Sequence, residues 1–177
     1  MIVNKLKISK DFSLNEFHCK DGSFLVKVDE KLVDKLQQLR DLVEMPLTIN
    51  SGYRTPEHNK NIGGSPKSQH MGGKAADVSI LNIPLPIETI AAFAETIGFT
   101  GIGMYDTFIH LDVRSIPSKW DLRTKKGSDT MKKGDQGKNI KELQQKLNEL
   151  GYNCGTPDGV FGAKLMQQLN NFKKKMA

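Results

Sequence analysis

Two short runs of the chain alternate apolar and polar side chains with the period of a β-strand. The runs cover residues 75–80 and 108–113, and their apolar positions are Ala76, Val78, Ile80, Ile109, Leu111 and Val113. Because successive side chains of a strand point to opposite faces, each run predicts a strand with one buried face. Asp77, His110 and Asp112 then lie on the faces that point away from the core.

Apolar residues at helical spacing predict two helices beside these strands. The first helix begins after Asp29, which can cap it, and runs to about Met45. The second helix covers residues 87–97 and ends before Gly98. Their inward positions are Leu32, Leu36, Leu39 and Val43 in the first helix and Ile90, Ala94 and Ile97 in the second.

Shorter patterns complete the first part of the chain. Ser13 and Glu16 have the spacing of a capping box, which predicts a short helical turn. Residues 46–50 are β-branched and bounded by proline, and they predict a further strand. Residues 100–105 predict a hairpin with residues 108–114. We therefore expect an α+β domain in which helices flank an antiparallel sheet.

The last part of the chain has a different pattern, typical of a small all-α module. Two predicted helices, the first over residues 138–150, have apolar positions at Ile140, Leu143, Leu147, Leu150, Leu165, Leu169 and Phe172. A polar, lysine-rich segment precedes them. The predicted organisation is a domain over residues 1–118, a linker over residues 119–133 with Trp120 as an anchor, and a three-helix module over residues 134–177.

The polar face of the predicted strands carries candidate metal ligands. His70 lies in a glycine-bearing loop that leads into the strand with Asp77, and His110 lies on the other strand. Two imidazoles and one carboxylate suit tetrahedral zinc, and three protein ligands leave a fourth position for water, as in catalytic sites. We predict one zinc ion held by His70, Asp77 and His110. The alternative is an ordinary surface, core or capping role for each residue.

A second candidate for chemistry is Arg54, in a loop that glycine and proline shape at residues 51–59. Its guanidinium is a planar fork that matches a carboxylate, so it can hold an anionic group of a substrate. The alternative interpretation is that Arg54 only pairs with a neighbour such as Glu57.

Composition and charge narrow the classes of partner. The net charge of +6 comes from residues 125–177, where 11 lysines face 5 acidic residues, so residues 1–124 balance at zero. This basic excess favours an anionic partner for the C-terminal module. No apolar run reaches membrane-spanning length, and we expect no membrane partner. Cys19 and Cys154 fall in different predicted domains, which predicts free thiols.

Three blocks of sequence carry a resemblance to a known family. The blocks are SGYRTPEHN, SQHMGGKAAD and GIGMYDTFIHLDVR, and the similarity spans roughly residues 12–114. They resemble the zinc D-alanyl-D-alanine carboxypeptidase family, whose fold is shared with hedgehog signalling domains and several phage endolysins. The resemblance implies that His70, Asp77 and His110 bind zinc, that Arg54 receives a substrate carboxylate, and that Ser68 helps to hold the substrate.

The C-terminal segment carries a second resemblance. The run MKKGDQGKNIKELQQKLNELGYNCGTPDGVFGAKLMQQLNNF is similar to a peptidoglycan-binding repeat of the small three-helix type. This implies that the partner of the basic module is peptidoglycan. Both parts of the chain then point to one substrate.

The chain departs from the family pattern at the catalytic base. Many members have a glutamate three residues before the last histidine ligand or a histidine two before it, whereas this chain has Thr107 and Phe108 there. Asp106 lies one residue further back, and we predict that it is the base. Asp112 shares a strand face with His110, and we predict that it orients the ligand imidazole.

These features predict a zinc peptidase that hydrolyses amide bonds in peptidoglycan stem peptides, as a D,D-carboxypeptidase or as an endopeptidase of the endolysin type. We expect a monomer, made in the cytoplasm because no secretory signal is evident in the first residues, that acts on the cell wall after phage-type lysis. One alternative is a non-catalytic wall-binding protein with a vestigial zinc site. The other, nucleic-acid binding, is suggested only by the lysines, and we do not expect it.

Overall fold

Five strands form one sheet in the computed structural model, which describes residues 5–83, 85–124 and 134–176. The strands are β1 Ile49–Ser51, β2 Ala75–Ser79, β3 Gly101–Met104, β4 Phe108–Asp112 and β5 Ser118–Asp121, and their order is β1-β2-β4-β3-β5. The first four pair antiparallel, as predicted, whereas β5 runs parallel to β3. The α+β class is confirmed, and the sheet is mixed.

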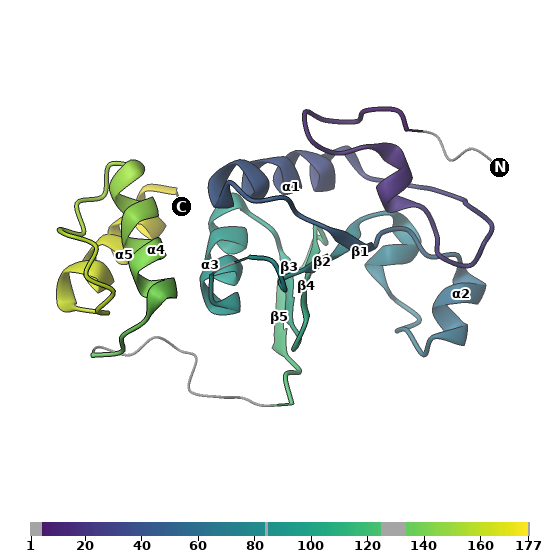
Figure 1. Cartoon of the computed structure of the whole chain (residues 1–177). Helices are drawn as coiled ribbons and strands as arrows, with labels where there is room; N and C mark the ends of the chain where they lie inside the picture. Colours follow the sequence, from purple (N-terminus) through teal and green to yellow (C-terminus); the bar gives the residue numbers. More distant parts are fainter. Residues whose placement is uncertain (1–4, 84, 125–133, 177) are drawn as a thin grey trace.

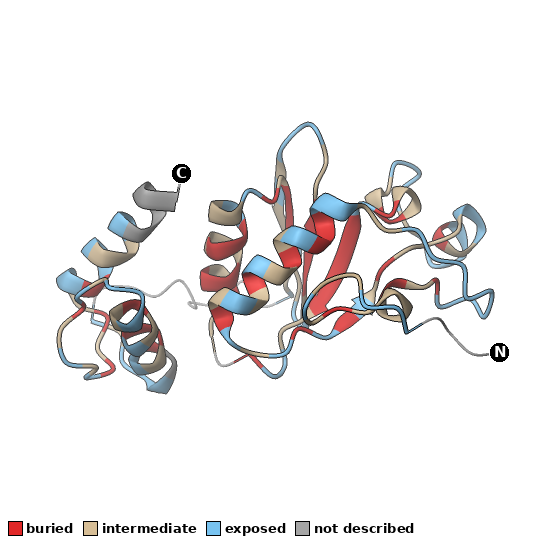
Figure 2. Cartoon of the chain, turned by 90° about the horizontal axis from the view of Figure 1, so that it is seen from above, coloured by how far each residue is buried: buried red, intermediate tan, exposed pale blue. Residues whose placement is uncertain are grey.

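Two helices lie on one face of the sheet, and the other helices lie outside this layer (Figure 1). The helices are α1 Glu30–Val43, α2 Pro56–Asn61, α3 Ile87–Ile97, α4 Lys138–Glu149 and α5 Ala163–Met176, with short 3₁₀ helices η1 Leu14–Phe17 and η2 Gln69–Gly72. Seen from above, α1 and α3 turn their buried sides to the sheet (Figure 2). The opposite face of the sheet is therefore free of α1 and α3.

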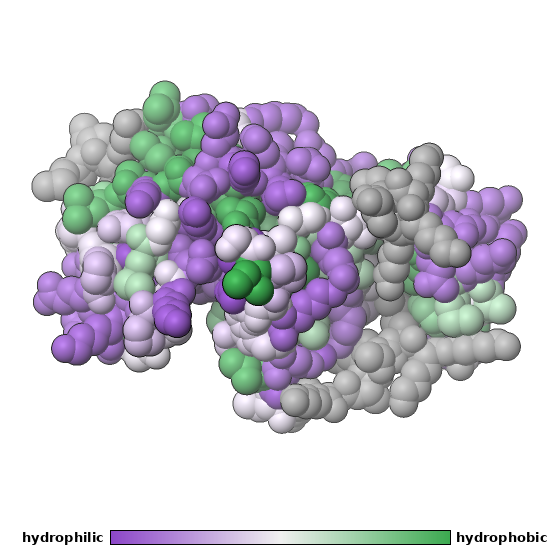
Figure 3. Space-filling model, turned by 180° about the vertical axis from the view of Figure 1, so that it is seen from behind, coloured by the Kyte–Doolittle hydropathy of each residue, from purple (hydrophilic) through white to green (hydrophobic). Residues whose placement is uncertain are grey.

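The surface seen from behind is mostly hydrophilic, with apolar groups concentrated at the end of the molecule that carries the N-terminus (Figure 3). Exposed apolar side chains in the described N-terminal segment include Leu6, Leu25 and Val26. Among the helices of the described residues, none combines the length and the apolar character needed to cross a membrane.

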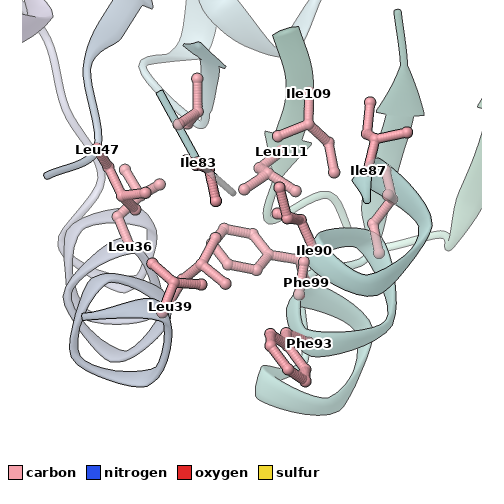
Figure 4. Close-up of a cluster of buried hydrophobic side chains, with 14 of the residues drawn as sticks. Leu36, Leu39, Leu47, Ile83, Ile87, Ile90, Phe93, Phe99, Ile109 and Leu111 are labelled. Atoms are coloured by element: carbon pink, nitrogen blue, oxygen red, sulfur yellow. The ribbon is translucent and has the colours of Figure 1, made fainter. Parts of the chain in front are cut away.

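The core fills the space between the sheet and the two helices (Figure 4). Leu36 and Leu39 of α1 and Ile90 of α3 are fully buried, as are Ile109 and Leu111 of β4. Burying one such side chain stabilises the fold by roughly 1.5–3 kcal/mol. The predicted alternation in β4 is confirmed: Ile109 and Leu111 face the core, and Phe108, His110 and Asp112 point to the opposite face of the sheet.

Local signals at the ends of the elements agree with the expected boundaries. The Asp29 side chain accepts a hydrogen bond from the Lys31 backbone N–H at the start of α1, and the capping box of Ser13 and Glu16 is formed at η1. Gly98 ends α3 with φ of 91°, in the left-handed region that glycine enters at low cost.

The start of one strand, one short helix and the start of the linker differ from the predictions. The strand expected at residues 46–50 begins only at Ile49. The helix α2 was not predicted, although Thr55 caps it and Pro56 occupies its first turn. The linker expected from residue 119 is wrong for its first three residues, because they belong to β5. The rest of that linker falls largely on residues 125–133, outside the described residues.

The C-terminal part contains α4 and α5 within residues 134–176. Its buried residues include the predicted positions Ile140, Leu143, Leu147 and Leu165, together with Cys154 and Phe161. The predicted position Phe172 lies outside the side chains that the structure describes. Both cysteines are free thiols, as predicted. The three-helix organisation stays a prediction, since two helices are seen in the described residues.

We predict that Leu36→Ala lowers the free energy of unfolding by about 2–5 kcal/mol, because it leaves a cavity between α1 and the sheet. Leu81→Ala is the matched control: Leu81 is 70% exposed and Leu36 is fully buried, so the control should change stability by less than about 0.5 kcal/mol. Urea unfolding followed by circular dichroism measures both. Equal losses in the two variants would contradict the assigned core.

Candidate metal centre

The register of two neighbouring strands brings two of the predicted ligands together. Asp77 of β2 pairs directly with His110 of β4. Side chains of directly opposed residues project from the same face of a sheet, with Cβ atoms about 4.5–5.5 Å apart. Both side chains therefore leave the sheet on the face opposite α1 and α3, and both are buried.

The third predicted ligand reaches the same point from η2, which leads into β2. The Nδ1 atom of His70 lies 2.6 Å from the carbonyl oxygen of Gly52, and the backbone oxygen of His70 accepts a hydrogen bond from Arg54 N–H at 3.2 Å. Gly73 ends η2 with φ of 70°, and a Cβ there would lie 2.5 Å from the backbone oxygen of Lys27. The chain can make this turn into β2 only with glycine.

Three donor atoms converge. His110 Nδ1 lies 2.8 Å from Asp77 Oδ1, and His70 Nε2 lies 3.2 Å from each of these two atoms. In a tetrahedral zinc site with bonds of about 2.0–2.1 Å, neighbouring donors are about 3.3 Å apart. The three residues form a group that can hold one metal ion, and only a small outward movement separates the observed spacings from those of zinc.

Hydrogen bonds on the far side of each ring determine which nitrogen faces the group. A carbonyl oxygen can only accept, so His70 carries its proton on Nδ1, toward Gly52. His110 Nε2 lies 3.0 Å from Asp112 Oδ2 and donates to that carboxylate. The lone pairs of His70 Nε2, His110 Nδ1 and an Asp77 oxygen then point at one another. Such a cluster repels itself unless a proton, shared as a hydrogen bond between an imidazole and Asp77, or a metal ion lies among its members.

The pKa shifts have the directions that this cluster requires. Burial raises the pKa of Asp77, but hydrogen bonds with His110 and His70 outweigh it and hold the pKa below its usual value. Burial lowers the pKa of His110, but its hydrogen bonds with Asp112 and Asp77 raise it above the usual value. The His110 shift shows that the neighbouring carboxylates favour positive charge at this imidazole, and the Asp77 shift shows that the imidazoles favour the ionised carboxylate.

Asp112 makes the contact with His110 that the strand phase predicted. It is fully buried, and Arg114 binds its carboxylate through Nε and Nη2. Burial raises the pKa of Asp112, but the bonds from His110 and Arg114 lower it to about 2, so the group stays ionised. A Cβ at Gly101, opposite Asp112, would lie 2.1 Å from its carboxylate oxygen. Glycine at this position gives the carboxylate its space.

Arg54 and Ser68, the predicted substrate residues, lie beside the group. Arg54 Nη2 donates to Asp77 Oδ2 at 2.5 Å and its Nε donates to Ser51 at 2.9 Å, so its partners here are not Glu57. Its Nη1 has no hydrogen-bond partner within the described chain. Ser68 precedes η2 as its N-cap residue, and its hydroxyl makes no capping hydrogen bond. The role of each in substrate binding stays a prediction.

Asp106 is not brought to the group. It is exposed in the turn between β3 and β4, and its carboxylate accepts hydrogen bonds from Thr124 N at 3.1 Å and Thr124 Oγ1 at 2.8 Å. Within the described residues, the carboxylates that contact the two histidines are Asp77 and Asp112. Asp106 reaches the site only if this turn rearranges.

Sequence reasoning missed the ion pair of Arg114 with Asp112 and the contact of the Trp120 ring with His110. Arg114 follows β4 by two residues, and an arginine two positions after a strand aspartate was a signal for the ion pair with Asp112. Trp120 falls in the predicted linker, and no local pattern there indicates its contact with His110.

Comparison with known proteins agrees with this geometry. A family model described as Peptidase M15 matches residues 10–112, more than half of the 177-residue chain, and the match includes all three donors. The chain belongs to the Peptidase M15 family. The predicted family resemblance is confirmed, and the site of this M15 peptidase fits one zinc ion.

Two further similarities cover smaller parts of the M15 peptidase chain. A model described as a putative peptidoglycan binding domain matches residues 136–177, which confirms the second resemblance. The zinc D-Ala-D-Ala carboxypeptidase of Streptomyces albus G is 44% identical over 45 residues. That similarity covers 25% of this chain and 18% of the Streptomyces protein.

We predict one zinc ion per chain, bound by the three donors. His70→Ala and His110→Ala should each lose stoichiometric binding, because two ligands remain of three. His58→Ala, a histidine outside the group on α2, should bind zinc like the unchanged chain. Equilibrium dialysis with metal analysis measures the ratio. Full binding by His110→Ala would show that the ion is held elsewhere.

Proposed function

We propose that this chain is a zinc peptidase of the bacterial cell wall that removes the terminal D-alanine from peptidoglycan stem peptides. The observation that supports it best is the donor set: two histidines and one aspartate would hold an ion with three protein ligands, the number that catalytic zinc sites use. The M15 match and the similarity to a D-Ala-D-Ala carboxypeptidase support the peptidase class. The match to a peptidoglycan-binding domain supports the wall as substrate.

The residues around the donors have separate tasks in this proposal. A zinc ion in this site would polarise the scissile carbonyl and make a water molecule more acidic. Gly52 and Asp112 hold the two imidazoles in the required tautomers. Arg54 orients the Asp77 carboxylate through Nη2. The chain thus arranges the ligands in advance, which lowers the cost of reaching the reactive geometry.

Arg54 also provides the means to align the substrate. Its side chain is 15% exposed, and its Nη1 amino group can donate to a carboxylate while Nη2 stays on Asp77. If it binds the terminal carboxylate of the stem, the last peptide bond lies at the zinc site. If it binds the side-chain carboxylate of D-glutamate, an internal bond lies there, and the enzyme is an endopeptidase. The hydroxyl of Ser68 can hold the neighbouring part of the peptide.

The proposed base is Asp106, in a state of the β3–β4 turn in which Thr124 has released its carboxylate. Asp112 is unsuited to this task, because its oxygens are bound to His110 and Arg114. Neither Thr107 nor Phe108 can accept a proton from water at neutral pH. This gap is also what favours the rival function, a wall-binding protein whose zinc site is vestigial.

Digestion of purified walls tests the proposal. We expect the chain to release free D-alanine from stem peptides, a chelator to stop the release, and zinc to restore it. Mass spectrometry of the stems identifies the bond, and cleavage within the stem would instead establish the endopeptidase. His110→Ala should bind walls but not cleave them. Wall binding without any cleavage by the zinc-loaded chain would favour the vestigial site.

We predict that Asp106→Asn lowers kcat by about 10²–10⁴-fold, the usual contribution of a general base, and leaves zinc content unchanged. Thr124→Val is the matched variant, since it removes the hydroxyl that holds Asp106 in the turn. It should leave kcat equal or higher. Unchanged kcat in Asp106→Asn would show that another group accepts the proton.

A further inference from the structure

Trp120 of β5 lies across the sheet and reaches a metal ligand two strands away. Gly103 of β3 pairs with Trp120 on one side and with His110 on the other. A Cβ at Gly103 would lie 2.4 Å from Nε1 and Cε2 of the indole, so the ring passes directly over this glycine. The ring centroids of Trp120 and His110 are 5.2 Å apart, with an angle of 43° between the planes.

The Nε1 edge of the indole, which lies over Gly103, is also held by a hydrogen bond. Trp120 Nε1 donates a hydrogen bond to the Tyr105 hydroxyl at 3.0 Å. Tyr105 in turn stacks on Phe108, with ring centroids 4.2 Å apart. Trp120 is half-buried. Its contacts with Gly103 and Tyr105 fix both its position and the rotation of its ring.

Arg114 links Trp120 back to the metal ligand by a second route. Its guanidinium carbon lies 5.1 Å from the Trp120 ring centroid, within the range of a cation–π interaction. The same guanidinium binds Asp112, and Asp112 accepts from His110 Nε2. The four side chains of His110, Asp112, Arg114 and Trp120 thus form a closed cycle of contacts, which we call the His110 support ring.

We propose that Trp120 is a positioning residue of the metal centre, which holds the His110 ring so that Nδ1 faces the other two donors. The second torsion of a histidine is broad and nearly two-fold, so contacts on one side alone do not prevent rotation of the ring. In the support ring, Asp112 binds the Nε2 edge and Trp120 packs beside the ring. Gly103 is required because any Cβ there displaces the indole. The proposal rests on the metal centre and not on which bond is cleaved.

Trp120 is the single tryptophan of the chain, so its fluorescence reports on this contact alone. Cobalt(II) is a suitable probe, because it occupies zinc sites and quenches a nearby indole. We expect one equivalent of cobalt to quench most of the emission of the full chain, and His70→Ala to abolish this quenching. Stoichiometric cobalt binding without loss of emission would overturn the proposed proximity.

Variants then test whether Trp120 positions the His110 ring or only lies near it. Trp120→Ala and Gly103→Ala should weaken cobalt binding about 10- to 100-fold, the usual effect of losing a residue that supports a metal ligand. Both should also alter the visible absorption of bound cobalt, since the geometry at His110 changes. Trp120→Phe, which keeps a ring over Gly103, should restore most of the affinity. Gly162→Ala is the control, because a Cβ there has nothing within 4 Å.

The outcomes distinguish this proposal from the proposed function. If Trp120→Ala and Gly103→Ala fold, as judged by circular dichroism, and bind cobalt with unchanged affinity and spectrum, Trp120 has no positioning role. If both lose affinity but Trp120→Phe does not recover it, the effect is general destabilisation and the proposal is also wrong. Failure of the chain to cleave walls removes the proposed function only, since metal affinity and fluorescence do not depend on substrate.

Discussion

The direct pairing of Asp77 with His110 across β2 and β4 is the constraint on which the site depends. The same pairing places Val78 opposite Ile109 and so fills the core on the other face. A shift of one residue in either strand would turn its ligand into the core and its apolar residues out. Packing against α1 and α3 therefore protects the ligand geometry, although neither helix supplies a donor to it.

Glycine determines how closely the supporting groups approach the ligands. Gly101 and Gly103 lie in β3 under Asp112 and Trp120, and a Cβ at either position would overlap the side chain above it. Gly73 permits the turn that carries His70 into the site. These three glycines weaken local secondary structure, because glycine loses more freedom on folding than other residues. The fold accepts this cost where close approach is needed.

The strands β2, β3 and β4, the helices α1 and α3, and the strand ligands Asp77 and His110 follow from short-range patterns in the sequence, because alternation and helical spacing directly report which side is buried. The helix α2 had a signal at Thr55 and Pro56 that we did not use. The strand β5 had almost none: its partner β3 lies across a crossover, and its residues show no apolar alternation. The contact of Trp120 with His110 depends on both pairings of Gly103, which no local pattern contains.

The most direct test of the metal centre is the tautomer of each ligand histidine in the zinc-loaded protein, measured from imidazole ¹⁵N shifts and their couplings. The structure predicts opposite tautomers: His70 protonated at Nδ1 toward Gly52 with Nε2 on the ion, and His110 protonated at Nε2 toward Asp112 with Nδ1 on the ion. Zinc-dependent shifts at these two nitrogens would support the account. The same tautomer in both rings, or no zinc-dependent shift at either, would contradict it.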